Sequence, residues 1–243
     1  MQFTRSILGY IVGSAFIYSI QGGRTENTEV IEVSKALGNL SEREYSKNDA
    51  DPIDQPTTAY PYRPVILFDF TTVEEVDNWR ELSDTVRTVG KSKAVLSLQR
   101  TEIFQRAIFF SLLNPQPNGA GFAGVRTPVN LNLSKFTNIE IKCRGQGQNS
   151  HYKVVLRHKG QNSNNDHTYE QFFEAPMSAG EFFDVVLPFD KFSAYYRGRL
   201  IPNAEPLDTS SITMFGLQIY GGVYSPIKQY GVSALELETI SAS

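Results

Sequence analysis

The chain has one cysteine and three histidines among 243 residues. One cysteine forms no internal disulfide, and no cysteine cluster is available to hold zinc. The formal net charge is only −3, which argues against a protein whose main role is to bind nucleic acid. No apolar run reaches the roughly 20 residues of a membrane-spanning helix. With 40% hydrophobic residues, the composition is that of an ordinary globular protein and names no function.

The charges that are present are distributed unevenly. Residues 1–25 carry two arginines and no acid, whereas residues 26–54 carry eight acids and three bases. The remaining 189 residues have 18 acids and 18 bases and are therefore neutral. This pattern predicts an N-terminal targeting segment over 1–25, an acidic, proline-containing linker over 26–64, and one folded domain over 65–243.

The N-terminal segment contains an uncharged stretch, residues 7–20, that follows Arg5. As a helix it would be ~21 Å long, against ~30 Å for a hydrocarbon core, so we expect no stable transmembrane span. Its length fits the apolar region of a secretory signal, and small residues follow it at Gly22 and Gly23. A mitochondrial presequence is the alternative, but the segment has few arginines. The residues alone favour the secretory interpretation.

The neutral part of the chain consists of short β-type runs separated by glycine, proline and asparagine. This punctuation predicts an all-β sandwich or barrel of about ten strands. The expected strands cover residues 65–70, 94–99, 107–113, 122–126, 138–144, 152–158, 168–175, 182–187, 212–220 and 230–240. Short helices are expected only at 72–79 and 189–195.

Strand alternation assigns side chains to faces. Residues 152–158 place Tyr152, Val154 and Leu156 on one face and Lys153, Val155 and Arg157 on the other. Such half-buried strands predict two sheets that enclose one core. We also expect Trp79, Phe122 and Phe136 to be largely buried.

The sequence shows no recognisable arrangement of catalytic or metal-binding residues. His151 and His158 lie at opposite ends and on opposite faces of one expected strand, and His167 is expected to be solvated in an asparagine-rich turn. No HExxH, CxxC or GxSxG pattern is present. Cys143 shares its face with isoleucines, which favours a small buried side chain over a reactive thiol. The sequence therefore predicts a non-enzymatic protein without a cofactor or metal.

Arginines and tyrosines at expected outward or edge positions form the candidate binding face. Its members are Arg126, Arg157, Tyr169, Tyr196 and Arg197. These residue types are enriched in interface hot spots, but an ordinary solvated face explains them equally well. Asn39 and Asn132 begin formal glycosylation sequons, which matter only if the chain enters the secretory pathway.

Motifs along the domain, taken in order, resemble those of the CIA30 family (complex I intermediate-associated protein 30). They are residues 67–70 (LFDF), Trp79, 83–94 (SDTVRTVGKSKA), 121–127 (GFAGVRT), 131–136 (LNLSKF), 152–157 (YKVVLR), 187–189 (LPF) with Phe192 and 197–198 (RG), and 212–217 (ITMFGL). Two positions depart from the family pattern. Val89 stands before Gly90 where the family has a second glycine, and Asn132 replaces an aspartate.

The resemblance implies a galactose-binding-like β-sandwich of the jelly-roll type. It also implies a chaperone-like assembly factor that binds subunits or assembly factors of mitochondrial respiratory complex I. The alternative is a carbohydrate- or protein-binding jelly-roll module in the secretory pathway, which the apolar N-terminal stretch, the sequons and the candidate face favour.

Overall fold

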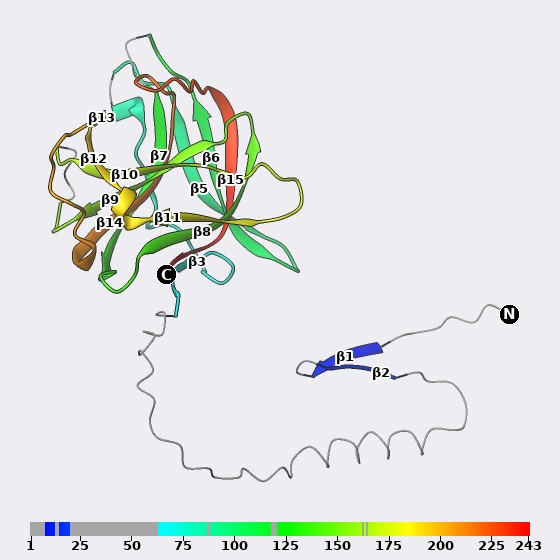
Figure 1. Ribbon diagram of the computed structural model, residues 1–243. Coiled ribbons are helices and arrows are strands. Elements are labelled where there is room, and N and C mark those ends of the chain that lie inside the picture. The colour runs from blue at the N-terminus through cyan, green and yellow to red at the C-terminus, as the bar shows by residue number, and fades with distance from the viewer. Residues whose placement is uncertain are drawn as a thin grey trace, which may run out of the picture. The chain divides into compact units, whose positions relative to one another are not determined.

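The structure is a computed structural model, shown in Figure 1. It describes residues 63–243 apart from 87, 118–120, 162 and 164, and the backbone of 8–12 and 15–19. Near the N-terminus, β1 (Leu8–Val12) and β2 (Ala15–Ser19) pair antiparallel, with Leu8 opposite Ser19. Both strands are rich in aromatic and β-branched residues, which favour extended backbone. Most of the predicted linker, including Asn39, lies outside the described residues.

Residues 59–243 form a separate compact unit, built of two antiparallel sheets. The first sheet has seven strands in the order β13-β12-β10-β9-β14-β7-β4. In that order they span Arg199–Leu200, Ser193–Tyr196, Thr168–Glu174, His151–His158, Ile212–Tyr220, Phe122–Leu131 and Arg80–Glu81. Strand β14 lies between β7 and β9, and both of these neighbours are distant from it in the sequence.

The second sheet has six strands, five of them in the order β11-β8-β15-β6-β5. They span Phe183–Pro188, Asn138–Gly147, Gly231–Ala242, Gln105–Leu113 and Lys93–Arg100. The sixth strand, β3 (Val65–Asp69), pairs with the end of β15, so that Val65 lies opposite Ala242. The final residue continues this sheet, because the Ser243 backbone exchanges hydrogen bonds with that of Asn138.

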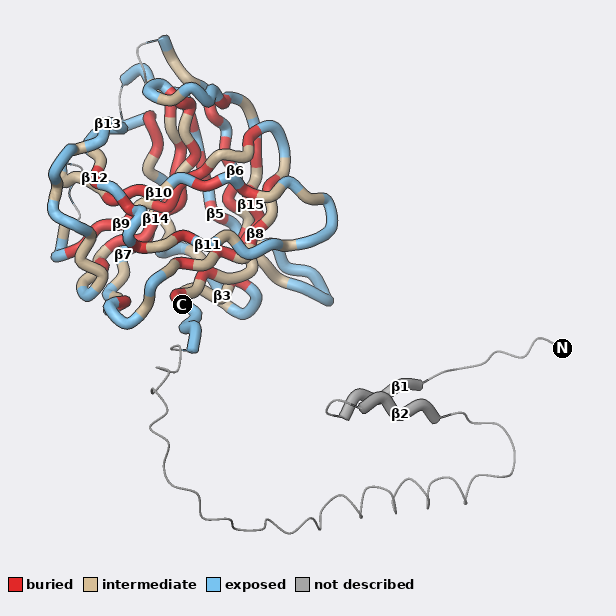
Figure 2. Tube along the Cα trace, viewed as in Figure 1, coloured by how far each residue is buried: buried red, intermediate tan, exposed pale blue. Residues whose placement is uncertain are grey.

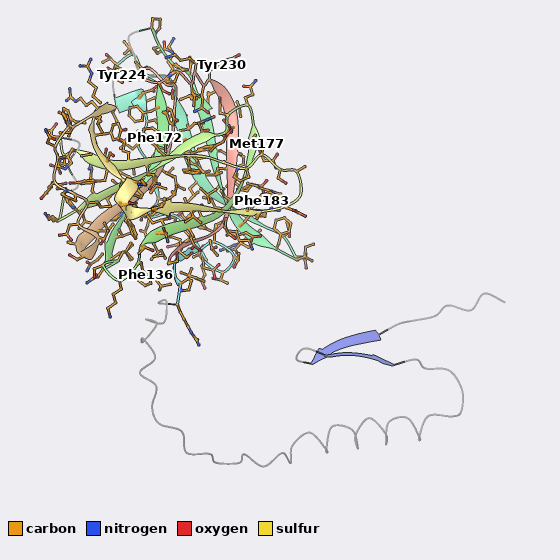
Figure 3. The ribbon with its side chains drawn as sticks, viewed as in Figure 1. Phe136, Phe172, Met177, Phe183, Tyr224 and Tyr230 are labelled. Atoms are coloured by element: carbon orange, nitrogen blue, oxygen red, sulfur yellow. The ribbon has the colours of Figure 1, made fainter. Side chains whose placement is uncertain are left out.

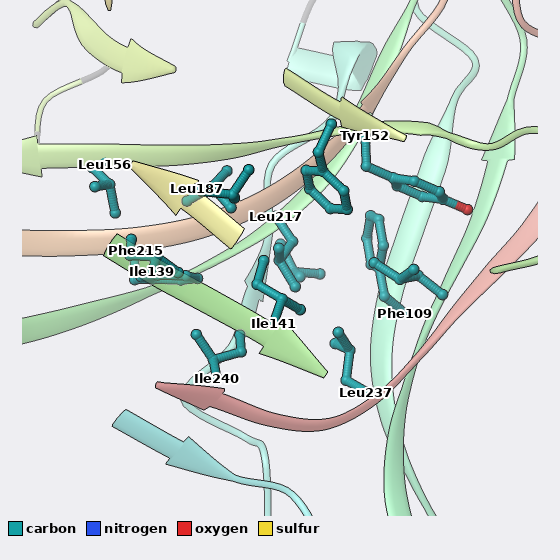
Figure 4. Packing of buried hydrophobic residues seen from close by; sticks show 14 of the residues in the cluster. Phe109, Ile139, Ile141, Tyr152, Leu156, Leu187, Phe215, Leu217, Leu237 and Ile240 are labelled. Atoms are coloured by element: carbon teal, nitrogen blue, oxygen red, sulfur yellow. The ribbon is translucent and has the colours of Figure 1, made fainter. Parts of the chain in front are cut away.

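The inward faces of the two sheets enclose one apolar core (Figures 2 and 4). Aromatic rings join the layers: the Phe109 ring centroid lies 6.2 Å from that of Tyr152, and Phe68 lies 5.2 Å from Phe215. Each fully buried aliphatic or aromatic side chain contributes roughly 1.5–3 kcal/mol. Cys143 is fully buried here, and burial raises the pKa of its thiol to about 12. It is therefore an inert packing residue.

All ten predicted strands are present, with ends shifted by a few residues. The prediction missed β1 and β2 near the N-terminus and, within the sandwich, β4, β12 and β13, which have two to four residues each. Among the described residues, helical structure is limited to three single 3-10 turns at Asp84–Val86, Phe189–Lys191 and Thr209–Ser211. No described helix has the length and hydropathy to cross a membrane.

The predicted helix at 72–79 is wrong, because other groups occupy the backbone carbonyls that it would use. Asp69 accepts hydrogen bonds from the backbone and hydroxyl of Thr71, which form a turn. Arg100 donates to the carbonyl of Val73, and Gln105 donates to the same carbonyl at 2.7 Å. Side chains from β5 and β6 thus hold the segment in an irregular form.

The predicted helix at 189–195 is also wrong beyond its first turn. After Phe189–Lys191 the chain extends into β12, where Ala194 pairs with Tyr169 of β10. Adding this strand gives the sheet an extra ladder of hydrogen bonds.

The predicted burial of Trp79, Phe122 and Phe136 is too strong, because all three are half-buried. Trp79 packs at the margin of the core, with its ring 5.0 Å from that of Phe68.

Candidate functional site

The alternation that fills the core also directs side chains outward from the seven-stranded sheet, and we call this surface the seven-strand face. Arg126 of β7 lies opposite Gly216 of β14, which lies opposite Val155 of β9. Two residues along β14, Met214 lies opposite Arg157. The register thus brings Arg126 and Arg157 onto one surface, on either side of a glycine.

A small hollow lies between these two arginines. Gly124 and Gly216 form part of its floor, and a Cβ on either would come within 2.9–3.1 Å of a neighbouring carbonyl oxygen. Its lining comprises Leu82, Gly124, Val125, Arg126, Val155, Arg157, Thr168, Met214, Gly216, Leu217 and Gln218. The cavity volume of about 30 Å³ fits roughly two water molecules, so no sugar ring fits inside.

Arg157 is the unusual member of the lining, because its guanidinium is buried without acceptors. The residue is only 3% exposed, and its Nε and Nη1 have no hydrogen-bond partner. Burial lowers the pKa of Arg157, and the positive charge of Arg126 lowers it further. Arginine nevertheless stays protonated in proteins, so a full positive charge lies beside the hollow.

A neutralised charge pair lies next to this site. Lys153 Nζ donates to Glu170 Oε2 at 2.5 Å, and Thr168 Oγ1 donates to the other carboxylate oxygen at 2.9 Å. Both charged side chains are buried. Lys153 also lies 5.5 Å from the centre of the Phe172 ring.

Aromatic rings border the charged pair. Phe172 lies 5.1 Å from Tyr220 and 5.6 Å from Tyr195, in both cases edge to face. Phe172 is 42% exposed on the sheet surface (Figure 3). The seven-strand face therefore combines an apolar platform with buried polar groups, a composition typical of binding surfaces.

The outward face of the other sheet, the six-strand face, also holds two arginines, whose side chains are 13% and 12% exposed. Arg106 and Arg144 contact the same oxygen of Glu236, at 2.6 and 3.0 Å. Arg144 also donates to the carbonyls of Ala179 and Gly180, which holds the β10–β11 connection against the sheet. Beside this network, exposed apolar side chains form a patch over β5, β6 and β15, consisting of Val95, Phe110, Leu112 and Val232.

The structure separates the other predicted face residues from Arg126 and Arg157. Tyr169 points into the core, is 1% exposed, and donates its hydroxyl to the carbonyl of Glu205 at 2.9 Å. Tyr196 and Arg197 lie exposed at the turn between β12 and β13, where Arg197 has a φ of 49° and stacks on the Tyr196 ring. Only two of the five candidates line the hollow.

Sequence reasoning missed Glu170, Phe172 and Tyr220 as parts of this surface. Alternation did place Lys153 on the face of Arg157, and that assignment is confirmed by the register. In residues 168–174 every second residue from Thr168 faces outward, but aromatic side chains on both parities conceal this alternation in the sequence.

Two of the three histidines mark the ends of β9, and at its start the Nδ1 of His151 lies 3.1 Å from the Ser150 hydroxyl oxygen. His158 is fully buried and its Nδ1 accepts from the Asp208 backbone N–H at 2.8 Å, so the proton of the neutral ring is on Nε2. Burial lowers the pKa of His158, and Lys159 adds to the effect. His167 is half-buried against the His158 ring, which corrects its predicted solvation. Within the described part of the chain, no three His, Cys, Asp or Glu side chains gather as a metal site would require.

The sequon at Asn132 is exposed at a turn, where Asn132 Oδ1 accepts from the backbone and hydroxyl of Ser134. Both hydrogen bonds use Oδ1, whereas a glycan would be attached at Nδ2, so they do not block this position.

The sandwich is of the jelly-roll type found in carbohydrate-binding modules. A family 11 carbohydrate-binding module from Clostridium thermocellum, solved with a β-1,3-1,4-mixed-linked tetrasaccharide, aligns over 74% of this chain and 94% of its own, with a TM-score of 0.54 and 16% identity. The family 11 module of the C. thermocellum cellulase Lic26A-Cel5E has the same coverage, with a TM-score of 0.53 and 13% identity. At these identities the likeness concerns the fold alone.

The sequence relationship is more specific. Residues 68–237 match the family described as Complex I intermediate-associated protein 30 (CIA30), and the chain belongs to this family. An uncharacterized protein of Schizosaccharomyces pombe, C9E9.15, is 27% identical over 157 residues, which cover 59% of this chain and 71% of the relative.

Proposed function

We propose that the chain is a non-enzymatic assembly factor that binds protein subunits or assembly factors of respiratory complex I in the mitochondrion. The family match over residues 68–237 is the observation that carries this proposal. The site is consistent with it, because its exposed and partly buried side chains include arginines and aromatic rings, which are enriched in interface hot spots.

The proposed contact surface is the seven-strand face. Its exposed Phe172 lies among Tyr195 and Tyr220, and aromatic side chains surrounded by polar groups are typical of protein interfaces. The apolar patch on the six-strand face is the competing surface, because exposed apolar patches also mark interaction sites.

The test is affinity purification of the C-terminally tagged full-length chain from its own organism, with quantitative mass spectrometry. We expect recovery of complex I subunits or assembly factors, and reduced complex I in a knockout. Recovery of neither, with normal complex I in the knockout, would overturn the proposal. Fluorescence of the same tagged chain tests its compartment, and a secretory location would contradict the mitochondrial assignment.

Two matched variants assign the surface. Phe172 and Phe110 are the same residue type with nearly equal exposure, 42% and 43%, on opposite sheets. Phe172→Ala should lower the yield of captured partners at least several-fold, whereas Phe110→Ala should leave it unchanged. The reverse result would preserve the assembly function and move its contact surface to the six-strand face.

A second candidate function is carbohydrate binding in the secretory pathway. The observation that favours it is the exposed Phe172 ring beside the polar side chains of Lys153 and Gln218, because sugars stack on such rings and bond to neighbouring polar groups. A glycan array that includes mixed-linked β-glucan tetrasaccharide, with wild type and Phe172→Ala, tests this function. A glycosidase mobility shift tests the sequons in parallel. Neither glycan binding nor a shift would remove this candidate.

A further inference from the structure

We propose that the hollow between β7, β9 and β14 binds a single carboxylate group, which pairs with the buried guanidinium of Arg157. This inference goes beyond the proposed function, because it names the chemistry of one contact whatever molecule carries the group.

The first argument is the uncompensated charge. A guanidinium has five N–H donors and no means of losing its proton, so burial without acceptors leaves both charge and donors unsatisfied. Arg157 is in this state at Nε and Nη1 while 97% of its surface is buried. Buried polar groups without partners are rare in folded proteins, and they concentrate at sites that bind something else.

The second argument is that the described residues offer no carboxylate that pairs with Arg157 at this place. Glu170 is already engaged by Lys153 and Thr168. Asp166 attracts Arg157 electrostatically, but its carboxylate accepts from the backbone of Ser163, and none of the ion pairs among the described residues joins it to Arg157. The charge beside the hollow therefore remains available.

The third argument is the shape and polarity of the hollow. Its small volume admits a group about as large as a carboxylate but not a sugar ring. Apart from the two arginines its walls are mostly apolar, including Leu82, Val155 and Met214, and an ion pair is stronger in such surroundings than in water. A planar carboxylate accepts two parallel hydrogen bonds from a guanidinium. Arg126 adds a second positive charge from the adjoining strand.

The experiment measures thermal unfolding of the full chain in sodium formate, against sodium chloride at equal ionic strength. A single ion pair gives millimolar affinity at best, so formate is titrated to about 100 mM. We expect the wild-type midpoint to rise with the logarithm of formate concentration above the dissociation constant, by about 3 °C at the highest concentration. Arg157→Met should remove the formate response and raise the midpoint in chloride. Equal responses of wild type and Arg157→Met would overturn the proposal.

Arg144→Met is the matched control, because Arg144 is a buried arginine that already has a carboxylate. This variant should lower the midpoint but keep the formate response. Arg157→Lys keeps the positive charge but loses the planar guanidinium that can donate two parallel hydrogen bonds. This variant should weaken the formate response at least several-fold. A stronger response to inorganic phosphate than to formate would overturn the assignment to a carboxylate.

If Arg157→Met does not fold, nuclear magnetic resonance of the wild type provides the test. The Arg157 Nε–H resonance should shift with formate and not with chloride, and an unshifted resonance would overturn the proposal. The same signal identifies the source of the carboxylate. The probes are an acetylated, amidated Ala-Glu-Ala peptide and the free acids succinate and citrate, with Ala-Gln-Ala as the negative control. If the peptide shifts the resonance at lower concentration than the acids, the carboxylate comes from a protein side chain. The reverse order indicates a free acid.

The two proposals can fail separately. Capture of complex I proteins without any formate response removes the carboxylate site and leaves the assembly function. A formate response that depends on Arg157, in a chain that captures no such protein, removes the assembly function and leaves the site.

Discussion

Largely buried arginine side chains lie on both outward faces of the sandwich, but their partners differ. On the six-strand face, Arg106 and Arg144 share Glu236, although the Nε of each arginine remains unpaired. On the seven-strand face, no carboxylate in the described part of the chain pairs with Arg157, and its Nε and Nη1 have no partner there. The first arrangement fastens a loop to a sheet, whereas the second leaves a buried positive charge beside a hollow.

This difference shows how one type of side chain serves two purposes in one fold. Desolvation of a charge costs free energy, and a partner carboxylate offsets most of that cost only when the geometry is good. The six-strand face meets this condition within the chain. The seven-strand face gives up stability at Arg157, as proteins commonly do at functional sites.

The largest effect is expected from Glu236→Ala, which would make the six-strand face resemble the seven-strand face. Two buried arginines would lose their shared carboxylate, and the free energy of unfolding should fall by about 3–5 kcal/mol. Urea denaturation followed by tryptophan fluorescence measures it. Glu238→Ala on the same strand is the control, because its pair with Lys142 is partly exposed and should contribute about 0–1 kcal/mol. Equal losses for the two variants would contradict the burial argument.

A smaller loss, about 2–3 kcal/mol, is expected from Glu170→Ala on the seven-strand face. The variant leaves Lys153 buried without its partner, but a lysine can give up its proton, as an arginine cannot. The same denaturation measurement applies, with the exposed Glu174→Ala as control. A loss larger than that of Glu236→Ala would reverse the ranking of the two faces.

Met214→Glu should supply the carboxylate that the seven-strand face lacks. Met214 is buried, lies opposite Arg157 in the register, and is close to glutamate in length. A double-mutant cycle with Arg157→Met measures the interaction between the introduced carboxylate and Arg157. We expect a favourable coupling free energy of about 1–2 kcal/mol between the two groups. Met214→Gln in the same cycle should show little coupling. Equal coupling for glutamate and glutamine would mean that charge does not matter at this position.

The smallest effect concerns His158, which follows Arg157 but faces inward. Because burial lowers the pKa of His158, the unfolded chain binds a proton first as the pH falls. Stability should therefore be fully present above about pH 6.5 and decline below it, by at most about 1.4 kcal/mol per pH unit. Unfolding midpoints between pH 7.5 and 5.5 measure the slope. His158→Gln should flatten it, and an unchanged slope would assign it to other groups.

Much of the fold could be predicted because half-buried strands alternate in residues of opposite polarity. Strand 212–220 was predicted with the bounds of β14. Strands of two residues, such as β4 and β13, are too short to show any period. The segment 72–79 has local helical character, but Arg100 and Gln105, distant in sequence, bind its carbonyls. Such long-range competition leaves no trace in a local pattern.

The site was predictable only where parity was unambiguous. Lys153, Val155 and Arg157 alternate with apolar neighbours, so their shared face follows from the sequence. Residues 168–174 carry aromatic side chains on both parities, with Tyr169 inward and Phe172 outward, so that alternation there could not choose. The position of Gly216 between two arginines depends on which strands pair, and pairing is decided by the whole sandwich.

The pairing of β3 with the end of β15 brings the two ends of the sandwich together. Val65 lies opposite Ala242, a separation of about 5 Å between Cα atoms in an antiparallel ladder. A linker of a few residues could therefore join the ends of this domain, and new termini could be opened at the exposed turn of residues 101–104. A circular permutant made in this way would keep both outward faces intact and free the domain from the segment that precedes it.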